Sequence, residues 1–377
     1  MFKSVLCSLV VLSFTAGAEA ATPIPQVPTI AAGAYLLIDA STGQQLAALN
    51  ADARVEPASI TKLMTAYAVF HALKDGRPAL TDNVIISPHA RAAEGSRTFL
   101  EVGTSVPVDV LLKGMIVQSG NDATIALAEK LAGTEPAFVD IMNQYAARLG
   151  MSNTHYDDST GMPAATHYSS AQDIVSLSRA IIREFPDRYS LYSLREFTWN
   201  KIRQPNRNGL LYRDASVDGI KTGHTDSAGY CLVSSAKRGN TRLIAVVLNT
   251  KSEKAREDAS ATLLEYGFNF FESLPLKKAG ELVLKPRVYK GAVNDVAVGP
   301  SEAVNVTVPR GQSASVSTSA TVQAPLIAPL SRTKAVGELQ ISVAGAVVRR
   351  VPLYPTVDVA EAGLFGRLYD SVWLWFQ

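Results

Sequence analysis

The chain has 377 residues, of which 47% are hydrophobic, and a formal net charge of +2 at neutral pH. This length is enough for two packed domains, and the hydrophobic share is that of an ordinary globular protein. The small net charge gives no support for a nucleic-acid partner, which would require a concentrated basic face, so we expect none. The sequence also lacks glycine-rich phosphate-binding motifs, and we expect no cofactor.

The N-terminus has the pattern of a secretory signal peptide. Lys3 supplies a short positive region, residues 5–14 form an apolar stretch, and Ala18-Glu19-Ala20 provides the small residues of a cleavage site. We therefore predict a signal peptide at residues 1–20 and export from the cytoplasm. The alternative is an uncleaved membrane anchor, but the apolar stretch is too short to span a bilayer comfortably.

The sequence contains two cysteines, Cys7 and Cys231. Cys7 lies within the predicted signal peptide, so the mature chain keeps one cysteine and forms no internal disulfide. Cys231 lies in a β-rich run between Tyr230 and Leu232. There we expect a small packed residue rather than a nucleophile or a metal ligand.

Residues 21–273 alternate between strand and helix patterns, which predicts an α+β domain with an antiparallel sheet flanked by helices. Within it, Ser170 and Asp173 form the pattern of a capping box at the start of a helix that ends near Phe185. The predicted elements are a hairpin at residues 33–49, a helix at 58–73, mainly helical structure over 108–185, strands within 215–249 and a helix at 253–271.

Residues 274–358 have a different composition and predict a separate β-sandwich-like domain. They are rich in Val, Ala, Ser and Thr, and apolar and polar residues alternate, as in Val304-Asn305-Val306-Thr307-Val308. Helical stripes and clusters of reactive side chains are missing from this sequence. We interpret the domain as a spacer or scaffold.

Residues 359–377 predict an amphipathic helix, at 362–377, that lies in the plane of a membrane surface. A helix of this length spans roughly 24 Å, which is too short to cross a bilayer. The alternative is a helix that packs on its own protein. The apolar residues on one helical face are Leu364, Phe365, Leu368, Val372, Trp375 and Phe376.

Three short motifs occur in order along residues 21–273. They are Ser59-Ile60-Thr61-Lys62, Ser119-Gly120-Asn121 and Lys221-Thr222-Gly223. Each motif alone is common by chance, but all three in this order indicate a serine acyl-transfer site. Such a site needs neither a histidine base nor a metal ion.

The first motif provides a nucleophile and a base. Ser59 and Lys62 are three residues apart, so a helix places them on one face. A lysine amine can take the serine proton if burial and nearby cations lower its pKa, and Lys221 is a candidate for such a cation. Ser59 also lies near a helix N-terminus, where backbone N–H groups can face a developing oxyanion.

The other two motifs provide a relay and substrate-binding groups. We expect Ser119 to pass a proton from Lys62 to the leaving amine, and Asn121 to donate to a substrate amide carbonyl and hold Lys62. Lys221 and Thr222 are candidates for binding a terminal carboxylate. Gly223 in a strand would let an extended peptide approach the backbone closely.

With these motifs, the chain resembles the low-molecular-mass penicillin-binding proteins, which are serine-type D-alanyl-D-alanine carboxypeptidases. The resemblance rests on residues 57–65, 118–123 and 217–225 and extends to the β domain and the amphipathic tail. It implies a serine β-lactamase/D,D-peptidase-like fold. It also implies a peptidoglycan stem peptide as substrate, β-lactam antibiotics as acylating ligands, and a role in cell-wall maturation and cell shape.

The resemblance also implies roles for individual residues. Ser59 becomes acylated, Lys62 is the base, and Ser119 and Asn121 assist. The backbone N–H groups of Ser59 and His224 form the oxyanion hole, and Arg207 steadies the carboxylate-binding region. The enzyme is expected in the periplasm, attached peripherally to the outer face of the cytoplasmic membrane, and its oligomeric state stays open.

Two other functions are considered beside the carboxypeptidase. A β-lactamase needs fast deacylation, often through a loop glutamate, but Glu135, Glu184 and Glu196 lack the usual ExxLN context. A wall-binding scaffold with an inactive site is the other alternative. Carboxypeptidase and endopeptidase reactions share one acyl-enzyme, so the sequence leaves both open.

The five histidines are not expected to act as the base. His224 follows the third motif and must lie near the site. It could serve as the base of a Ser-His-Asp triad, but Lys62 is better placed to deprotonate Ser59. The remaining four show no metal-ligand spacing and are interpreted as surface or packing residues. They are His71, His89, His155 and His167.

Overall fold

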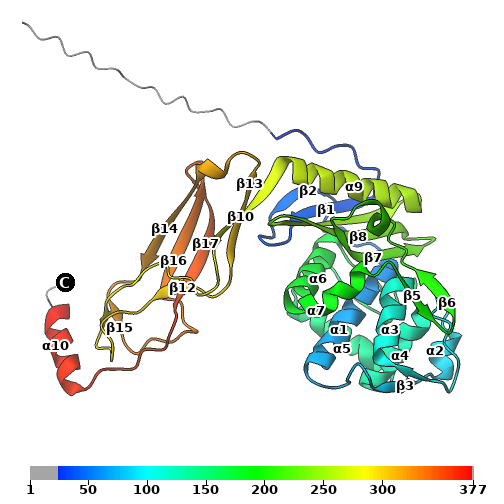
Figure 1. Ribbon diagram of the computed structural model, residues 1–377, viewed down its shortest axis with the longest axis horizontal. Helices are drawn as coiled ribbons and strands as arrows, with labels where there is room; N and C mark the ends of the chain where they lie inside the picture. The colour runs from blue at the N-terminus through cyan, green and yellow to red at the C-terminus, as the bar shows by residue number, and fades with distance from the viewer. Residues whose placement is uncertain (1–23, 376–377) are drawn as a thin grey trace, which may run out of the picture.

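The structure is a computed structural model, and it describes residues 24–375. The predicted signal peptide at residues 1–20 lies outside the described residues. Figure 1 shows two parts: a mixed α/β part that contains the N-terminal half of the chain, and an elongated β part that ends in a single helix.

The first part is built on a five-stranded antiparallel sheet with the strand order β2-β1-β9-β8-β7. The predicted hairpin is present as β1 (Ala34–Asp39) and β2 (Gln45–Leu49). The predicted strands of the 215–249 region are β7 (Val217–Thr225), β8 (Gly229–Arg238) and β9 (Thr241–Thr250). Strand β7, which carries the third motif, is therefore an edge strand.

Helices cover both faces of this sheet because its central strands are apolar on both sides. In β1, Leu36 and Ile38 pack into one hydrophobic core, whereas Tyr35 and Leu37 pack into the other. Helix α9 (Glu253–Phe270) covers the second core, as Figure 1 shows. The predicted α+β fold is confirmed.

The opposite face carries a helical subdomain that holds the first two motifs. Its elements are η1 (Ala58–Thr61), α1 (Lys62–Lys74), β3 (Asn83–Ile85), α2 (Pro88–Ala92), β4 (Ser105–Pro107), α3 (Val108–Lys113), η2 (Gly114–Gln118), α4 (Asn121–Ala132), α5 (Glu135–Arg148), α6 (Ala171–Glu184), α7 (Pro186–Tyr189), η3 (Ser190–Ser193), β5 (Glu196–Trp199) and β6 (Ile202–Pro205). The short helix α8 (Leu210–Arg213) instead packs into the second core, beside α9.

The start of α6 corrects one detail of the sequence analysis. Ser170 caps the helix, because its side chain accepts a hydrogen bond from the Asp173 N–H at 3.2 Å. The Asp173 carboxylate, however, accepts from the Asn153 N–H at 2.8 Å and the Thr154 hydroxyl at 2.7 Å. The predicted capping box is therefore only half formed, and Asp173 instead fixes the preceding loop.

The second part contains mainly short antiparallel strands around a core of valine, leucine and isoleucine. Its first strand begins at Phe271, directly after α9. Its elements are β10 (Phe271–Lys277), β11 (Val288–Tyr289), β12 (Val298–Pro300), β13 (Val304–Pro309), η4 (Ser313–Ser315), β14 (Val316–Val322), β15 (Leu326–Ile327), β16 (Gly337–Val343) and β17 (Ala346–Pro355).

Hydrogen bonds join the turn after β1 to this second part. The Ser273 hydroxyl donates to the carboxylate of Asp39, which is buried, and the hydroxyls of Thr42 and Thr307 lie 2.6 Å apart. These contacts fix the start of the β part against the β1–β2 side of the five-stranded sheet.

The chain ends in helix α10 (Leu364–Leu374), which lies at the far end of the β part (Figure 1). The carboxylate of Asp370 accepts hydrogen bonds from the Lys290 N–H at 2.5 Å and from Arg287 at 3.3 Å. No side chain of α10 is buried, and Phe365 and Trp375 are 87% and 89% exposed. Among residues 24–375, no helix combines the length and the apolar character required to span a membrane.

Candidate active site

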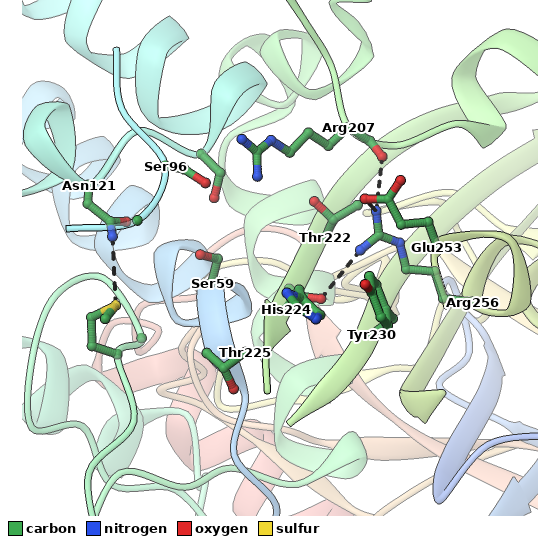
Figure 2. A pocket seen from close by; sticks show the side chains of 15 residues that line it. Ser59, Ser96, Asn121, Arg207, Thr222, His224, Thr225, Tyr230, Glu253 and Arg256 are labelled. Carbon is green, nitrogen blue, oxygen red and sulfur yellow. Dashed lines mark hydrogen bonds and ion pairs between the residues drawn. The ribbon is translucent and has the colours of Figure 1, made fainter. Parts of the chain in front are cut away.

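A cavity of about 390 Å³ lies where the helical subdomain meets strand β7, and all three motifs contribute to its lining. This volume falls within the range of small-molecule sites. Figure 2 shows Ser59 in the middle, with Asn121 on one side and Thr222 and His224 on the other. The lining residues are Ser59, Gly95, Ser96, Ser119, Asn121, Gly161, Met162, Arg207, Thr222, Gly223, His224, Thr225, Tyr230, Glu253 and Arg256.

Ser59 and Lys62 meet as the sequence predicts. Ser59 lies in η1 and Lys62 is the first residue of α1, so the two side chains are one helical turn apart. The Lys62 Nζ lies 2.8 Å from the Ser59 Oγ, and Ser59 is only half-buried. The distance permits direct proton transfer from the hydroxyl to the amine.

The surroundings of Lys62 make it a base near neutral pH. Its side chain is 1% exposed, and burial is the main reason why its pKa falls from 10.5 to about 7. Asp158 raises this pKa and Arg207 lowers it, so Arg207 contributes the cationic effect that we expected from Lys221. A neutral amine beside a serine hydroxyl can accept its proton.

The carbonyl of Thr160 is a second partner of Lys62, and the sequence analysis missed it. The Lys62 Nζ donates to this oxygen at 2.6 Å. Thr160 belongs to a tight turn, residues 158–161, that we call the Asp158 turn. Gly161 has a φ of +89°, and a Cβ there would lie 1.8 Å from the Ala58 carbonyl oxygen. Glycine is thus required where this turn packs against η1.

Ser119 has a lysine partner, Lys221, that the sequence analysis did not predict. It follows the π-helical segment η2 and adopts the left-handed conformation, with a φ of 66°. Its Oγ accepts a hydrogen bond from the Lys221 Nζ at 2.9 Å. The two serines and two lysines therefore form two pairs, Ser59–Lys62 and Ser119–Lys221.

Asn121 lines the cavity but has other contacts than the expected one with Lys62. Its Nδ2 donates to the Glu94 carbonyl at 2.6 Å, and its backbone N–H donates to the Ser96 carbonyl at 2.7 Å. The Asn121 Oδ1 is buried without a hydrogen-bond partner. This oxygen can therefore accept a hydrogen bond from a bound substrate amide.

Lys221 is buried beneath the cavity, with 3% exposure. Burial, followed by the charges of Lys62 and Arg207, keeps its pKa well below 10.5. Thr222, rather than Lys221, lines the cavity from strand β7. The charge of Lys62 thus disfavours protonation of Lys221.

Gly223 serves a purpose that we did not predict. A Cβ at this position would lie 2.9 Å from the Pro57 carbonyl oxygen and 3.3 Å from the Ala58 Cβ. Glycine therefore lets β7 approach η1. The absence of a side chain fixes the distance between the third motif and the nucleophile.

The ring of His224 packs against the ring of Tyr230 at a tilt of 32°, with the ring centroids 4.0 Å apart. Its side chain is exposed, whereas the partner of Ser59 is Lys62. Arg207 lies across the cavity with its guanidinium directed toward Ser96 (Figure 2). Both residues are therefore at the site, and His224 does not take the place of a triad base.

Two residues of α9 at the site were missed. Arg256 is buried and donates to the Arg207 carbonyl at 3.3 Å and the Gly223 carbonyl at 3.5 Å. Glu253 lies 3.5 Å from the Arg256 guanidinium and lines the cavity (Figure 2). Both belong to a helix whose pattern indicates only packing, so spatial proximity, not sequence, reveals them.

The three glutamates considered for deacylation have partners away from the cavity. Glu135 accepts from the Ser159 N–H at 3.0 Å, Glu184 accepts from the Tyr67 hydroxyl at 2.8 Å, and Glu196 pairs with an exposed arginine. Among residues 24–375, no group of three or more His, Cys, Asp or Glu side chains is placed to hold a metal ion. Cys231 is free and buried, as expected, and burial raises the pKa of its thiol to about 11.

Comparisons with known proteins match the chain over both of its parts. Residues 21–252 match the peptidase S11 family model, described as D-alanyl-D-alanine carboxypeptidase. Residues 271–361 match the model of the C-terminal domain of penicillin-binding protein 5.

Individual relatives extend the match to nearly the whole chain. D-alanyl-D-alanine carboxypeptidases DacA and DacC of Escherichia coli strain K12 are each 42% identical to it, covering 94% and 97% of this chain and 90% and 93% of their own lengths. The solved structure of penicillin-binding protein 5 from Haemophilus influenzae is 41% identical, with a TM-score of 0.83 over 90% of this chain and 99% of that one.

Proposed function

Because the chain belongs to the D-alanyl-D-alanine carboxypeptidase family, we propose that it removes the terminal D-Ala from peptidoglycan stem peptides that end in D-Ala-D-Ala. The observation that carries this proposal is the Lys62 amine, 2.8 Å from the Ser59 hydroxyl and with a pKa of about 7. This pair provides a serine nucleophile with its own base at neutral pH.

The reaction proceeds in two steps. Neutral Lys62 takes the Ser59 proton as the Oγ attacks the carbonyl carbon of the penultimate D-Ala. The peptide C–N bond breaks, the proton that Lys62 accepted passes through Ser119 to the leaving amine of D-Ala, and an acyl-serine ester remains. Water then hydrolyses this ester and regenerates the hydroxyl. The backbone N–H groups of Ser59 and His224 stabilise the oxyanion in both steps.

Substrate binding follows from the position of β7 at the edge of the sheet. An extended stem peptide can pair with the free side of this strand, as in strand addition. Thr222 and Arg207 line the cavity beyond it and bind the terminal carboxylate. The negative charge of that carboxylate also favours protonation of Lys221, which donates to Ser119 at 2.9 Å.

β-Lactams acylate the same serine in this proposal, and the acyl-enzyme is long-lived. The engagement of Glu135, Glu184 and Glu196 away from the cavity supports slow rather than fast deacylation. The β-lactamase alternative is therefore less well supported than the carboxypeptidase.

We further propose that the mature enzyme begins after residue 20 and works in the periplasm. Its catalytic domain continues to the end of α9, its β domain begins at β10, and residues 359–377 attach it to the outer face of the cytoplasmic membrane. The exposed apolar side chains of α10 support this attachment. The β domain acts as a spacer between that membrane and the active site, which serves cell-wall maturation and cell shape.

The first test measures D-alanine release from a peptide ending in Lys-D-Ala-D-Ala, using the mature protein and its Ser59→Ala variant. We expect release by the unaltered protein and none above background by the variant. Release by both would exclude Ser59 as the nucleophile. Release by neither, with normal penicillin acylation of the unaltered protein, would favour the lactamase or scaffold alternatives.

A further inference from the structure

His167 is a buried histidine whose contacts differ from those expected for a surface or packing residue. Its side chain is buried, at 2% exposure. The ring Nε2 lies 2.8 Å from the Thr61 Oγ1, and the ring Nδ1 lies 3.4 Å from the Asp158 carboxylate. The Asp157 N–H also approaches Nδ1, at 3.3 Å. Both ring nitrogens therefore contact polar groups.

Asp158 organises the turn that follows it. One carboxylate oxygen accepts hydrogen bonds from the Thr160 N–H at 2.6 Å, the Thr160 hydroxyl at 2.7 Å and the Gly161 N–H at 2.7 Å. The other oxygen faces His167. These bonds direct the Thr160 carbonyl toward the Lys62 Nζ, at 2.6 Å.

The contacts form a closed ring around the base. Lys62 bonds to the Thr160 carbonyl, Asp158 shapes that turn, and His167 connects Asp158 to Thr61. Thr61 directly precedes Lys62 in the chain. His167 thus connects the chain at Thr61, next to Lys62, with the Asp158 turn, whose Thr160 carbonyl binds the Lys62 amine. These two segments are far apart in sequence.

We propose that His167 and Asp158 are positioning residues that hold the Thr160 carbonyl and the Lys62 amine in the geometry needed for acylation of Ser59. The proposal deepens the proposed function and rests on the role of Lys62 as base. The imidazole sets the separation between η1 and the Asp158 turn, so its loss displaces the amine from the serine. A displacement of about 1 Å lowers the rate of such a step by about a hundredfold.

Electrostatic effects agree with this geometry. Burial raises the pKa of Asp158, but the neighbouring His167 ring and the hydrogen bonds from Thr160 outweigh burial, so the net pKa is lowered and Asp158 stays ionised. Its charge opposes the depression of the Lys62 pKa by burial. The other charged groups that act on Lys62 are Arg207, Asp122 and Glu135.

The test compares β-lactam acylation of the unaltered protein with the His167→Ala, His167→Gln and Asp158→Asn variants. The matched control is His155→Ala, which removes an exposed histidine from the same segment, 3.4 Å from Asp157. Stopped-flow kinetics separate the non-covalent dissociation constant from the acylation rate constant. Melting temperatures establish that each variant is folded at the assay temperature.

We expect His167→Ala to lower the acylation rate constant by about 10- to 100-fold without changing the dissociation constant more than about twofold. His167→Gln keeps an amide donor for Thr61 and recovers most of the loss. His155→Ala behaves as the unaltered protein. Asp158→Asn lowers the plateau rate and also moves the acidic limb of the pH profile to lower pH, because it removes an anion that favours protonated Lys62.

Folded His167→Ala and Asp158→Asn variants that acylate at the unaltered rate would overturn the proposal. The proposal would also be overturned if the acidic limb of the pH–rate profile did not move in Asp158→Asn, because that result indicates a merely structural role. If His167→Ala does not fold, the acylation rate constants and pH–rate profiles of His167→Gln and Asp158→Asn test the proposal in its place. Failure of the proposed function is distinguishable, because the unaltered protein itself would then not be acylated.

Discussion

The active site and the α10 segment both contain side chains in unfavourable surroundings. The active site buries polar side chains in the protein interior, whereas the α10 segment exposes apolar side chains to water. Lys62 and Lys221 are buried amines, whereas Phe365 and Trp375 are exposed aromatic residues. Burying an amine costs several kcal/mol, and leaving a large apolar side chain in water forgoes about 1.5–3 kcal/mol. Neither arrangement favours folding, so each is explained by function: chemistry in one region and binding in the other.

Replacing the buried Lys62 amine tests whether its burial serves catalysis rather than stability. Lys62→Met should lower β-lactam acylation by about 10²- to 10⁴-fold, the usual contribution of a general base. The free energy of unfolding should stay within about 1 kcal/mol or rise, because replacing a buried charge with an apolar side chain is often neutral or stabilising. Acylation kinetics and thermal unfolding measure the two effects.

Lys237→Met, on the exposed end of β8, is the control for that substitution. It should change neither quantity. Full activity of Lys62→Met would mean that another group deprotonates Ser59.

Gly223→Ala tests whether the close approach of β7 to η1 is needed. The added Cβ would lie 2.9 Å from the Pro57 carbonyl, and overpacking of this kind costs about 1–3 kcal/mol. We expect a lower melting temperature together with slower acylation, since η1 carries the nucleophile. The control is Gly363→Ala, because nothing lies within 4 Å of a Cβ there. Equal melting temperatures for the two variants would contradict this account.

Two leucines of similar exposure test whether the exposed apolar face of α10 binds membranes. Leu368 on α10 is 57% exposed and Leu282 in the β domain is 54% exposed. Leu368→Ser should weaken binding to lipid vesicles by about tenfold, the effect of about 1.5 kcal/mol of lost apolar burial. Vesicle co-sedimentation measures this effect, and Leu282→Ser should leave it unchanged.

Deleting residues 362–377 extends this test. The deletion should release the protein from membranes and leave activity on small soluble peptides intact. Continued membrane binding after the deletion would exclude α10 as the anchor.

The smallest expected effect concerns pH. Lys62 must be neutral to act as a base, so activity should fall as the pH decreases through about 7. Arg207→Gln removes a cation that disfavours protonated Lys62, which raises the Lys62 pKa and moves the acidic limb to higher pH. The Arg203→Gln variant, which alters an exposed arginine of β6 paired with Glu196, should not move it. A shift to lower pH in Arg207→Gln is the contradicting result.

The sequence predicts those parts of the site that depend on local spacing. Ser59 and Lys62 meet because a helical turn brings them together, and the hairpin and α9 follow from periodic apolar residues. The Thr160 carbonyl was not predictable, because a backbone oxygen leaves no signature in the residue types. His167 was missed for a related reason: its partners, Thr61 and Asp158, meet it only through the tertiary fold.

Gly223 is needed for a packing reason that the sequence does not suggest. The pattern indicates that glycine is required, but not what approaches it. Only the fold reveals that the neighbour is the Pro57–Ala58 backbone. The Ser119–Lys221 pair is a similar case, since it joins two motifs that the sequence presents separately.

The burial of Cys231 has a practical consequence for experiments on this protein. Its thiol lies in the sheet core with a pKa of about 11, so thiol-directed dyes and spin labels will leave it unmodified under mild conditions. Once residues 1–20 are removed, the chain contains no other thiol. A cysteine introduced on α10 or at the rim of the cavity would therefore carry a probe at one defined place, in an otherwise native enzyme.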